Sequence, residues 1–163
     1  MTGATTSGAA AAAGLLLQRP AVPKQAARPA PSVHPLGLVP NRDTLLFVPA
    51  RYTANQPAPL ALLFHGAGGV AEYGLSLLQG LADKANLLLL APASRGPTWD
   101  IIQNDYGPDV ALIDQALEHV FTRYAVDPTH LAIGGFSDGA SYALSLGLTN
   151  GDPFTHIIGP GTE

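Results

Sequence analysis

The sequence predicts an α/β protein whose mostly parallel sheet is flanked by helices, and three observations support this fold class. Short apolar runs alternate with amphipathic segments through most of the chain, which is typical of a parallel sheet covered on both faces. Hydrophobic residues make up 47% of the sequence and charged residues 12%, a composition that suits a buried sheet. The length of 163 residues fits one domain with a core of its own.

Charge and composition argue against several classes of function. The formal net charge is −4, so no basic surface is expected that would neutralise nucleic-acid phosphates. The chain has no cysteine, which excludes disulfides, thiolate zinc sites and a cysteine nucleophile. No His, Asp and Glu residues follow the spacing of metal ligands, and no apolar run is long enough to span a bilayer. We therefore expect no nucleic-acid partner, no metal site and no membrane span.

Residues 1–35 differ in composition from the rest, and we expect a flexible Ala/Pro-rich arm followed by one domain over residues 36–163. The apolar run at residues 9–17 resembles the core of an export signal, but no Lys or Arg precedes it, whereas export signals begin with basic residues. The alternative to an arm is a signal remnant, left behind if translation begins further upstream. Cytoplasmic and exported locations therefore both remain open.

Apolar periodicity and turn signals predict the first elements. A turn cluster at residues 40–43 separates β-prone runs at residues 36–39 and 44–48, which predicts an antiparallel hairpin. Residues 60–64 and 86–90 are continuous apolar runs, as expected of strands buried on both faces. Between these strands, helical spacing predicts a helix that ends near Lys84 and buries Leu75, Leu77, Leu78 and Leu81.

A second, longer helix is predicted to begin at Pro108 and Asp109. Its buried stripe consists of Val110, Ile113, Leu117, Val120, Phe121 and Tyr124. The apolar run at residues 131–133 is the next parallel strand. Strand–helix–strand units have right-handed crossovers, and the reactive groups of such sheets lie at the carboxyl ends of the strands. His65, the loop at residues 91–100 and Ser137 should therefore converge.

The strand at residues 131–133 runs into Gly135-Phe136-Ser137-Asp138-Gly139, and a helical pattern follows. This motif matches G-x-S-x-G, in which the serine sits on a strained strand-to-helix turn with its hydroxyl exposed above the sheet. Glycine is needed at Gly135 and Gly139 because side chains there would collide with the adjoining strand and helix. We interpret Ser137 as a nucleophile; an idle serine in a glycine-rich turn is the alternative.

Acyl transfer also needs donors aimed at the oxyanion of the tetrahedral intermediate. The segment His65-Gly66-Ala67-Gly68-Gly69 follows a buried strand, and its glycines let backbone N–H groups face inward. We expect the N–H of Ala67 or of a neighbouring glycine (Gly66, Gly68) and the N–H of Asp138 to form the oxyanion hole, with His65 bracing the loop. The alternatives are a helix-capping turn and a phosphate cradle, although no lysine follows as G-x-x-x-x-G-K-[ST] requires.

The resemblance to a known family rests on three segments. They are Phe-His-Gly-Ala-Gly-Gly from residue 64, Ala-Pro-Ala-Ser-Arg-Gly-Pro-Thr-Trp from residue 91, and Gly-Gly-Phe-Ser-Asp-Gly-Ala-Ser-Tyr-Ala-Leu from residue 134. Over residues 36–158 the chain resembles the α/β-hydrolase superfamily, and within it the phospholipase/carboxylesterase and polyhydroxybutyrate-depolymerase-like esterases. This resemblance implies hydrolysis of a small or polymeric ester through an acyl-enzyme at Ser137, without a cofactor.

The chain differs from this superfamily in the acid and the base of the catalytic triad. Both follow the nucleophile in the superfamily, and residues 141–163 offer only Asp152 and His156. His156 would stand at the amino end of its strand, away from Ser137, so we interpret it as structural. We therefore expect an α/β-hydrolase domain that lacks its C-terminal strands and its triad acid and base. Such a chain should be a poor hydrolase, because an oxyanion hole and binding alone retain about 10³–10⁴-fold catalysis over water.

For several other residues, two interpretations remain open. Asp100, Asp105 and Asp109 lie near strand ends, where a carboxylate could approach the site, although Asp109 is more simply a cap or first-turn charge of the long helix. Trp99 and Tyr73 are candidates for the wall of an acyl or aryl pocket, although core packing explains either residue equally well.

Two further interpretations of the whole chain remain. The sheet is expected to end near residues 155–158 in an unpaired apolar edge, and such edges invite strand addition or self-association. A non-catalytic interaction protein, or a homo-oligomer formed through this edge, is therefore the alternative to an enzyme. The other alternative is a fragment of a longer esterase.

Overall fold

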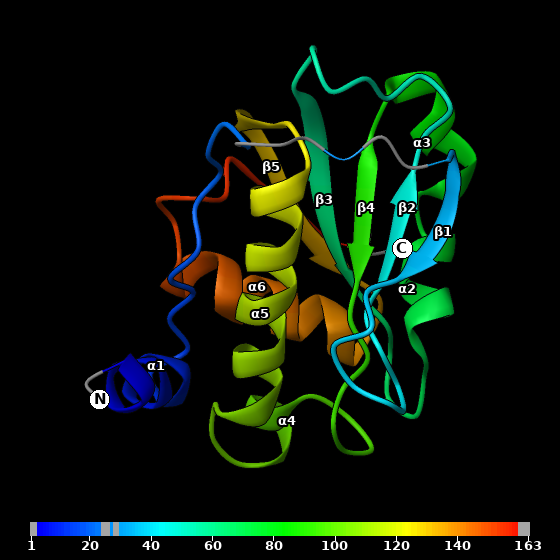
Figure 1. Cartoon of the computed structure of the whole chain (residues 1–163). Helices are drawn as coiled ribbons and strands as arrows, with labels where there is room; N and C mark the ends of the chain where they lie inside the picture. The colour runs from blue at the N-terminus through cyan, green and yellow to red at the C-terminus, as the bar shows by residue number, and fades with distance from the viewer. Residues whose placement is uncertain (1–2, 24–26, 28–29, 160–163) are drawn as a thin grey trace.

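A six-stranded sheet with helices on both faces forms the fold in the computed structural model, which describes residues 3–23, 27 and 30–159 (Figure 1). The strands are β1 (Ser32–Pro35), β2 (Leu45–Val48), β3 (Ala58–Phe64), β4 (Leu88–Ala91), β5 (Val126–Gly135) and β6 (His156–Ile158). The helices are α1 (Gly3–Ala12), α2 (Ala71–Ser76), α3 (Gln79–Ala85), α4 (Asp100–Gln103), α5 (Pro108–Arg123) and α6 (Asp138–Thr149). None of these described helices is long and apolar enough to cross a bilayer.

The strand order is β1-β2-β4-β3-β5-β6. β2 pairs antiparallel with β1 and β4, whereas the pairs β4–β3, β3–β5 and β5–β6 are parallel. The prediction of a mostly parallel α/β sheet is therefore confirmed. Because β3, β4 and β5 run in the same direction, their carboxyl ends meet at one edge of the sheet, and the loops that follow them lie together there.

Helices cover the two faces of the sheet unequally. α5 and α6 pack on one face over a large core that includes Leu62, Ile113 and Leu146, and α2 and α3 pack on the other over a smaller core that includes Leu63 and Leu75 (Figure 1). The long helix α5 begins at Pro108 as predicted. The whole predicted stripe is buried, and it comprises Val110, Ile113, Leu117, Val120, Phe121 and Tyr124.

The predicted hairpin forms, but its first strand lies further upstream. β1 is Ser32–Pro35 rather than residues 36–39, because Asp43 turns the later residues into a loop. Its carboxylate accepts the N–H groups of Gly37 at 2.5 Å and Leu38 at 3.2 Å, and Gly37 has a φ of 72°. The sheet therefore begins inside the predicted arm, so residue 35 marks no boundary in the structure.

The described part of the N-terminal segment packs against the rest of the chain. α1 lies beside α5 (Figure 1), and Leu16 is only 2% exposed. Asn150 fixes the segment from α6: its Oδ1 accepts the N–H of Leu16 at 2.8 Å, and its Nδ2 donates to Gly14 O at 2.8 Å. The expected flexible arm is therefore packed where it is described; its residues 1–2, 24–26 and 28–29 lie outside the described residues.

The single helix predicted after β3 is two short helices, α2 and α3. Leu78 has a φ of −129° and a ψ of 0°, which ends the helical path between them. Leu75 is buried, but Leu77 is 38% and Leu81 60% exposed, so the predicted stripe is wrong for these two leucines. The following strand also starts later than predicted, at Leu88, because Asn86 has a φ of 52° and ends α3.

Candidate active site

Ser137 occupies the turn between β5 and α6. Its φ of 53° and ψ of −118° are a strained backbone conformation for a residue with a side chain. A methyl group added at Gly135 would lie 2.9 Å from Ala140 N, and one added at Gly139 would lie 2.7 Å from the carbonyl carbon of Phe64. The turn can therefore close only with glycine at both positions. Ser137 itself is exposed.

The loop at residues 65–69 runs beside Ser137. A methyl group added at Gly66 would lie 3.5 Å from Ser137 Cβ. The N–H of Gly68 donates to Pro97 O at 2.7 Å, and that of Gly69 donates to Gly66 O at 3.0 Å, so both are occupied. The N–H groups of Ala67 and Asp138 have no acceptor among the described residues. Of the three amides at positions 67–69, that of Ala67 is the one left for a ligand.

His65 is fully buried under this loop, and its hydrogen bonds define its tautomer. Nε2 accepts the N–H of Ser94 at 3.0 Å, so Nδ1 carries the hydrogen and donates to Gly66 O at 2.6 Å. Burial lowers the pKa of His65, which keeps the ring neutral. With both nitrogens engaged, His65 ties the loop at residues 65–69 to the loop after β4, and it has no free nitrogen to accept a proton from Ser137.

Arg42 adds a second tie between the same two loops. Its guanidinium donates to Gly69 O at 2.9 Å and to Ser94 O at 2.9 Å. No sequence signal indicates this role, since Arg42 lies in a turn cluster far from both loops in the chain. Only the pairing of β2 with β4 brings the turn that precedes β2 close to the carboxyl end of β4.

The loop after β4 also reaches the residue that follows Ser137. Thr98 Oγ1 donates to Asp138 Oδ2 at 2.8 Å. Next to it, Trp99 is fully buried, donates from Nε1 to His65 O at 2.9 Å, and stacks on Tyr142 with ring centroids 4.9 Å apart. Core packing is therefore the correct interpretation of Trp99, and not a pocket wall.

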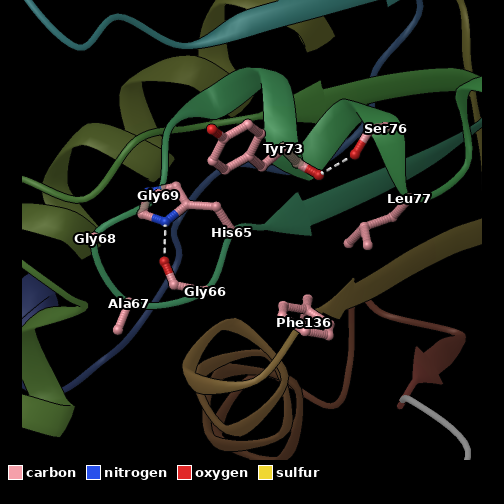
Figure 2. Close-up of a pocket in the computed structure, with 9 residues that line it drawn as sticks. All are labelled: His65, Gly66, Ala67, Gly68, Gly69, Tyr73, Ser76, Leu77 and Phe136. Atoms are coloured by element: carbon pink, nitrogen blue, oxygen red, sulfur yellow. Dashed lines mark hydrogen bonds between the residues drawn. The ribbon is translucent and has the colours of Figure 1, made fainter.

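A pocket of about 380 Å³ opens beside the loop at residues 65–69 (Figure 2). Its apolar walls are Tyr73, Leu77 and Phe136, which are 62%, 38% and 59% exposed. The remaining lining residues are His65, Gly66, Ala67, Gly68, Gly69 and Ser76. Because Gly66 also lies against Ser137, the pocket adjoins the serine. Of the three apolar residues, the sequence indicated only Tyr73 as a pocket candidate.

The two buried carboxylates near the site, those of Asp100 and Asp109, accept hydrogen bonds from backbone N–H groups. Asp100 Oδ2 accepts the N–H groups of Gly107 at 2.9 Å and Asp109 at 3.0 Å, which caps the start of α5. Asp109 in turn accepts the N–H groups of Arg95 and Asp100, both at 2.7 Å. Burial raises the pKa of Asp109 to about 6. The pair thus anchors the loop at residues 95–100 to α5, while Asp105 is exposed.

No other histidine adjoins Ser137. His156 is the first residue of β6 and lies opposite Ala132 of the parallel strand β5, whereas Ser137 follows the carboxyl end of β5. His130 lies in the same region, His34 is in β1 and His119 is in α5. Asp152 forms an ion pair with Arg19 at 3.0 Å. Neither residue suggested by the sequence as a triad partner is therefore close to the serine.

Comparison with known proteins connects this chain to esterases. No family model matches it. It is 34% identical over 114 residues to a probable feruloyl esterase C of Aspergillus flavus, covering 64% of this chain and 41% of the relative. It is 30% identical over 123 residues to a probable feruloyl esterase C of Aspergillus niger, covering 71% of this chain and 44% of the relative. The chain thus spans less than half the length of these relatives.

Solved structures show the same fold at lower identity. An acetyl xylan esterase from Aspergillus awamori matches with a TM-score of 0.63 and 16% identity, over 77% of this chain and 50% of the other. A ferulic acid esterase from Anaeromyces mucronatus matches with a TM-score of 0.55 and 19% identity, over 82% of this chain and 60% of the other. The chain therefore has the α/β-hydrolase fold, and its resemblance to the esterases of that superfamily is confirmed.

Proposed function

We propose that this chain attacks carboxylic esters with Ser137 and forms an acyl-enzyme. The observation that carries the proposal is the strained turn that exposes Ser137 beside two backbone N–H groups, those of Ala67 and Asp138, which have no acceptor within the described residues. The names of the relatives support the ester class.

In the proposed reaction, Ser137 Oγ bonds to the ester carbonyl carbon, and negative charge develops on the carbonyl oxygen, to which the N–H groups of Ala67 and Asp138 donate. When the carbonyl forms again, the bond from its carbon to the alkoxide oxygen breaks, and the alkoxide leaves as the alcohol with the proton of Ser137. Each such donor contributes about 10²–10³-fold to turnover. Water releases the acid from the acyl-enzyme in the second half of the reaction, and no cofactor takes part.

We further propose that the reaction in this chain is slow. A serine enzyme normally uses a histidine as general base, and each of the five histidines lies elsewhere or has both nitrogens engaged. The oxyanion donors and substrate binding alone support about 10³–10⁴-fold acceleration over water. The proton of Ser137 must then pass to solvent or to the substrate itself.

The pocket next to Ser137 supports the proposal that the acyl group of the substrate is aromatic. Tyr73 and Phe136 offer exposed ring faces, and Leu77 closes the apolar wall between them (Figure 2). Aromatic rings pack favourably against such walls in offset or edge-to-face geometry. We therefore propose an ester of a hydroxycinnamic acid, the class that the names of the feruloyl esterase relatives contain.

A fluorophosphonate probe tests the nucleophile, because it phosphonylates an activated serine without needing a specific acyl group. We expect slow labelling at one site, lost in Ser137→Ala and kept in Ser141→Ala. Ser141 is a matched control, as it is exposed on the same helix one turn further on. Labelling that survives Ser137→Ala, or no labelling of the folded protein at any probe concentration, would contradict the proposal.

A second candidate function, association with another copy of this chain, is favoured by β6. All three of its residues are exposed, with Ile157 at 40% and Ile158 at 39%, and Leu148 on the neighbouring helix α6 is 71% exposed. Edge strands with apolar side chains add strands from other chains. Light scattering over a range of concentrations should show a dimer or larger species; a monomer throughout would refute this function.

A further inference from the structure

Two histidines that are far apart in the sequence lie next to each other on the sheet. β5 and β6 are parallel with Ala132 opposite His156. His130 precedes Ala132 by two residues and so points to the same face. The two imidazole rings are nearly parallel, with centroids 6.4 Å apart and planes 12° apart. Both side chains are exposed, that of His130 by 61%, so a hydrated cation can reach both rings.

Only Nδ1 of His156 has a hydrogen-bond partner in the described part of the chain. Thr155 Oγ1 lies 2.8 Å from this Nδ1 and 3.1 Å from Leu131 O. When the hydroxyl donates to Leu131 O, it accepts from Nδ1, and Nε2 presents its lone pair to solvent. An ion bound at Nε2 selects this tautomer.

For His130, the neighbouring carboxylate of Asp127 determines the tautomer. Its Nδ1 lies 2.8 Å from Asp127 Oδ2 and 3.0 Å from Thr129 Oγ1. The carboxylate can only accept, and the Thr129 hydroxyl donates its hydrogen to Asp127 Oδ1 at 2.7 Å, so it accepts as well. Nδ1 of His130 must therefore be the donor. Neither Nε2 has a hydrogen-bond partner in the part of the chain that the structure describes.

We propose that His130 and His156 together bind one divalent transition-metal ion of the Zn²⁺, Ni²⁺ or Cu²⁺ class through their Nε2 atoms. Neutral imidazole nitrogen suits these ions, whereas Mg²⁺ and Ca²⁺ prefer oxygen. No group of three His, Cys, Asp or Glu side chains able to hold a metal occurs among the described residues, so water fills the remaining coordination positions.

The rings need only a modest adjustment to share an ion. Metal–nitrogen distances of about 2.0–2.1 Å require the two Nε2 atoms to come within about 4 Å of each other. Exposed side chains reorient on the picosecond-to-nanosecond timescale, so rotation of both rings can supply this approach. The contact of Asp127 with Nδ1 of His130 is the arrangement that usually orients a metal-binding imidazole and raises its basicity.

His130 lies in the middle of β5 and His156 at the amino end of β6, opposite Ala132. The pair is thus separated along the strands from Ser137, which follows the carboxyl end of β5, and this site is independent of the proposed esterase function. A shared ion would link the short edge strand β6 to β5. The expectation from the sequence of no metal site rested on spacing along the chain, and spacing cannot show a pair that only strand pairing assembles.

The test is a titration of the untagged, metal-stripped full chain with Zn²⁺, followed by NMR of the histidine ring signals. We expect one ion per chain, with the ring signals of His130 and His156 shifting together, and no shift with Mg²⁺. His130→Asn and His156→Asn should each abolish saturable Zn²⁺ binding. Asp127→Asn should weaken it about 10-fold or more.

His34→Asn and His119→Asn are the matched controls, because they remove an imidazole elsewhere and should leave the Zn²⁺ affinity unchanged. All variants are first checked for the native fold by circular dichroism. Absence of Zn²⁺ binding would overturn the proposal. So would two ions per chain, or an affinity that either single histidine variant leaves intact, since each result means that the two rings do not share an ion.

Discussion

Thr98 and Asp138 link the loop after β4 to the residue that follows the candidate nucleophile. Thr98 Oγ1 donates to Asp138 Oδ2 at 2.8 Å, and Asp138 supplies one of the two proposed oxyanion donors through its own N–H. The loop that carries Thr98 also accepts the N–H of Gly68 through Pro97 O at 2.7 Å. One loop therefore positions both sides of the proposed oxyanion hole.

Replacing Thr98 with valine should loosen this arrangement while keeping the shape of the side chain. We expect the unfolding free energy to fall by about 1–3 kcal/mol, because the lost hydrogen bond is made to a carboxylate. The rate of fluorophosphonate labelling at Ser137 should fall as well. The matched control is Thr122→Val at an exposed position of α5, where the hydroxyl bonds only within its own helix; it should leave the labelling rate unchanged. Equal labelling rates in Thr98→Val and wild type would contradict this role.

Gly139→Ala should disrupt the turn at Ser137. A methyl group there would overlap the carbonyl oxygens of Phe64 and His65, and backbone atoms cannot move aside cheaply. We expect labelling at Ser137 to be lost and the thermal unfolding temperature to drop. Gly80→Ala is the control: a methyl group there meets no atom within 4 Å, and removing a helical glycine stabilises by about 0.5–1 kcal/mol. Normal labelling in Gly139→Ala would refute the close packing of the turn.

The parallel strands, α5 and the serine turn could be predicted because local signals dictate them. Strands buried on both faces are continuous apolar runs, and α5 combines a proline start with a regular apolar stripe. The break between α2 and α3 could not be predicted in the same way. A methyl group at Gly74 would lie 2.8 Å from Leu63 O, so a tertiary contact fixes α2 against β3. Leu75 is buried there, whereas Leu77 and Leu81 turn towards solvent.

The same distinction between local signals and tertiary contacts applies to the candidate site. Ser137 and the loop at residues 65–69 carry recognisable motifs, so the sequence could indicate them. Arg42 and Thr98 act only through partners that are distant in the chain, and neither belongs to a motif. The packing of residues 14–19 was missed for a similar reason. The apolar composition suggested a flexible arm or a signal, whereas side chains distant in the chain hold the segment: Asn150 bonds Gly14 and Leu16, and Asp114 accepts the N–H groups of Leu17 and Gln18.

Tyr73→Ala should reduce the reaction with aromatic esters selectively. The ring is 62% exposed and lines the pocket beside Ser137, so its removal takes away a stacking surface worth about 0.5–1.5 kcal/mol. We expect a lower rate with methyl ferulate and an unchanged rate with p-nitrophenyl acetate. Leu148→Ala, an exposed apolar residue remote from this pocket, should affect neither substrate. Equal losses with both esters would show that Tyr73 does not contact the acyl group.

Asn150→Ala should release the N-terminal segment. The substitution leaves the N–H of Leu16 and the carbonyl of Gly14 without their partner, and a buried unsatisfied polar group costs about 1–3 kcal/mol. We expect denaturant unfolding to show a loss in this range, and hydrogen exchange to show faster exchange at Leu16. Asn104→Ala, at an exposed position, is the control for loss of an asparagine. Unchanged protection of Leu16 in Asn150→Ala would mean that other contacts hold the segment.

The stability of the chain should depend on the titration of Asp109. Burial raises the pKa of this carboxyl from 3.8 to about 6, so the folded state binds the proton more tightly than the unfolded state does. The stabilisation from that proton is complete below pH 4, declines as the pH rises through 6 and is absent at neutral pH. A shift of this size corresponds to about 3 kcal/mol at most.

Asp109→Asn isolates this contribution, because the amide cannot ionise. Its single oxygen accepts only one of the two N–H groups of Arg95 and Asp100, so the variant should be less stable than wild type by an amount that does not depend on pH. Subtracting its unfolding free energy from that of wild type should give a difference that falls between pH 4 and 6 and is constant above pH 7. Asp105→Asn, at an exposed carboxylate, controls for the lost charge. A flat difference from pH 4 to 7 would show that the pKa of Asp109 is not raised in the folded chain.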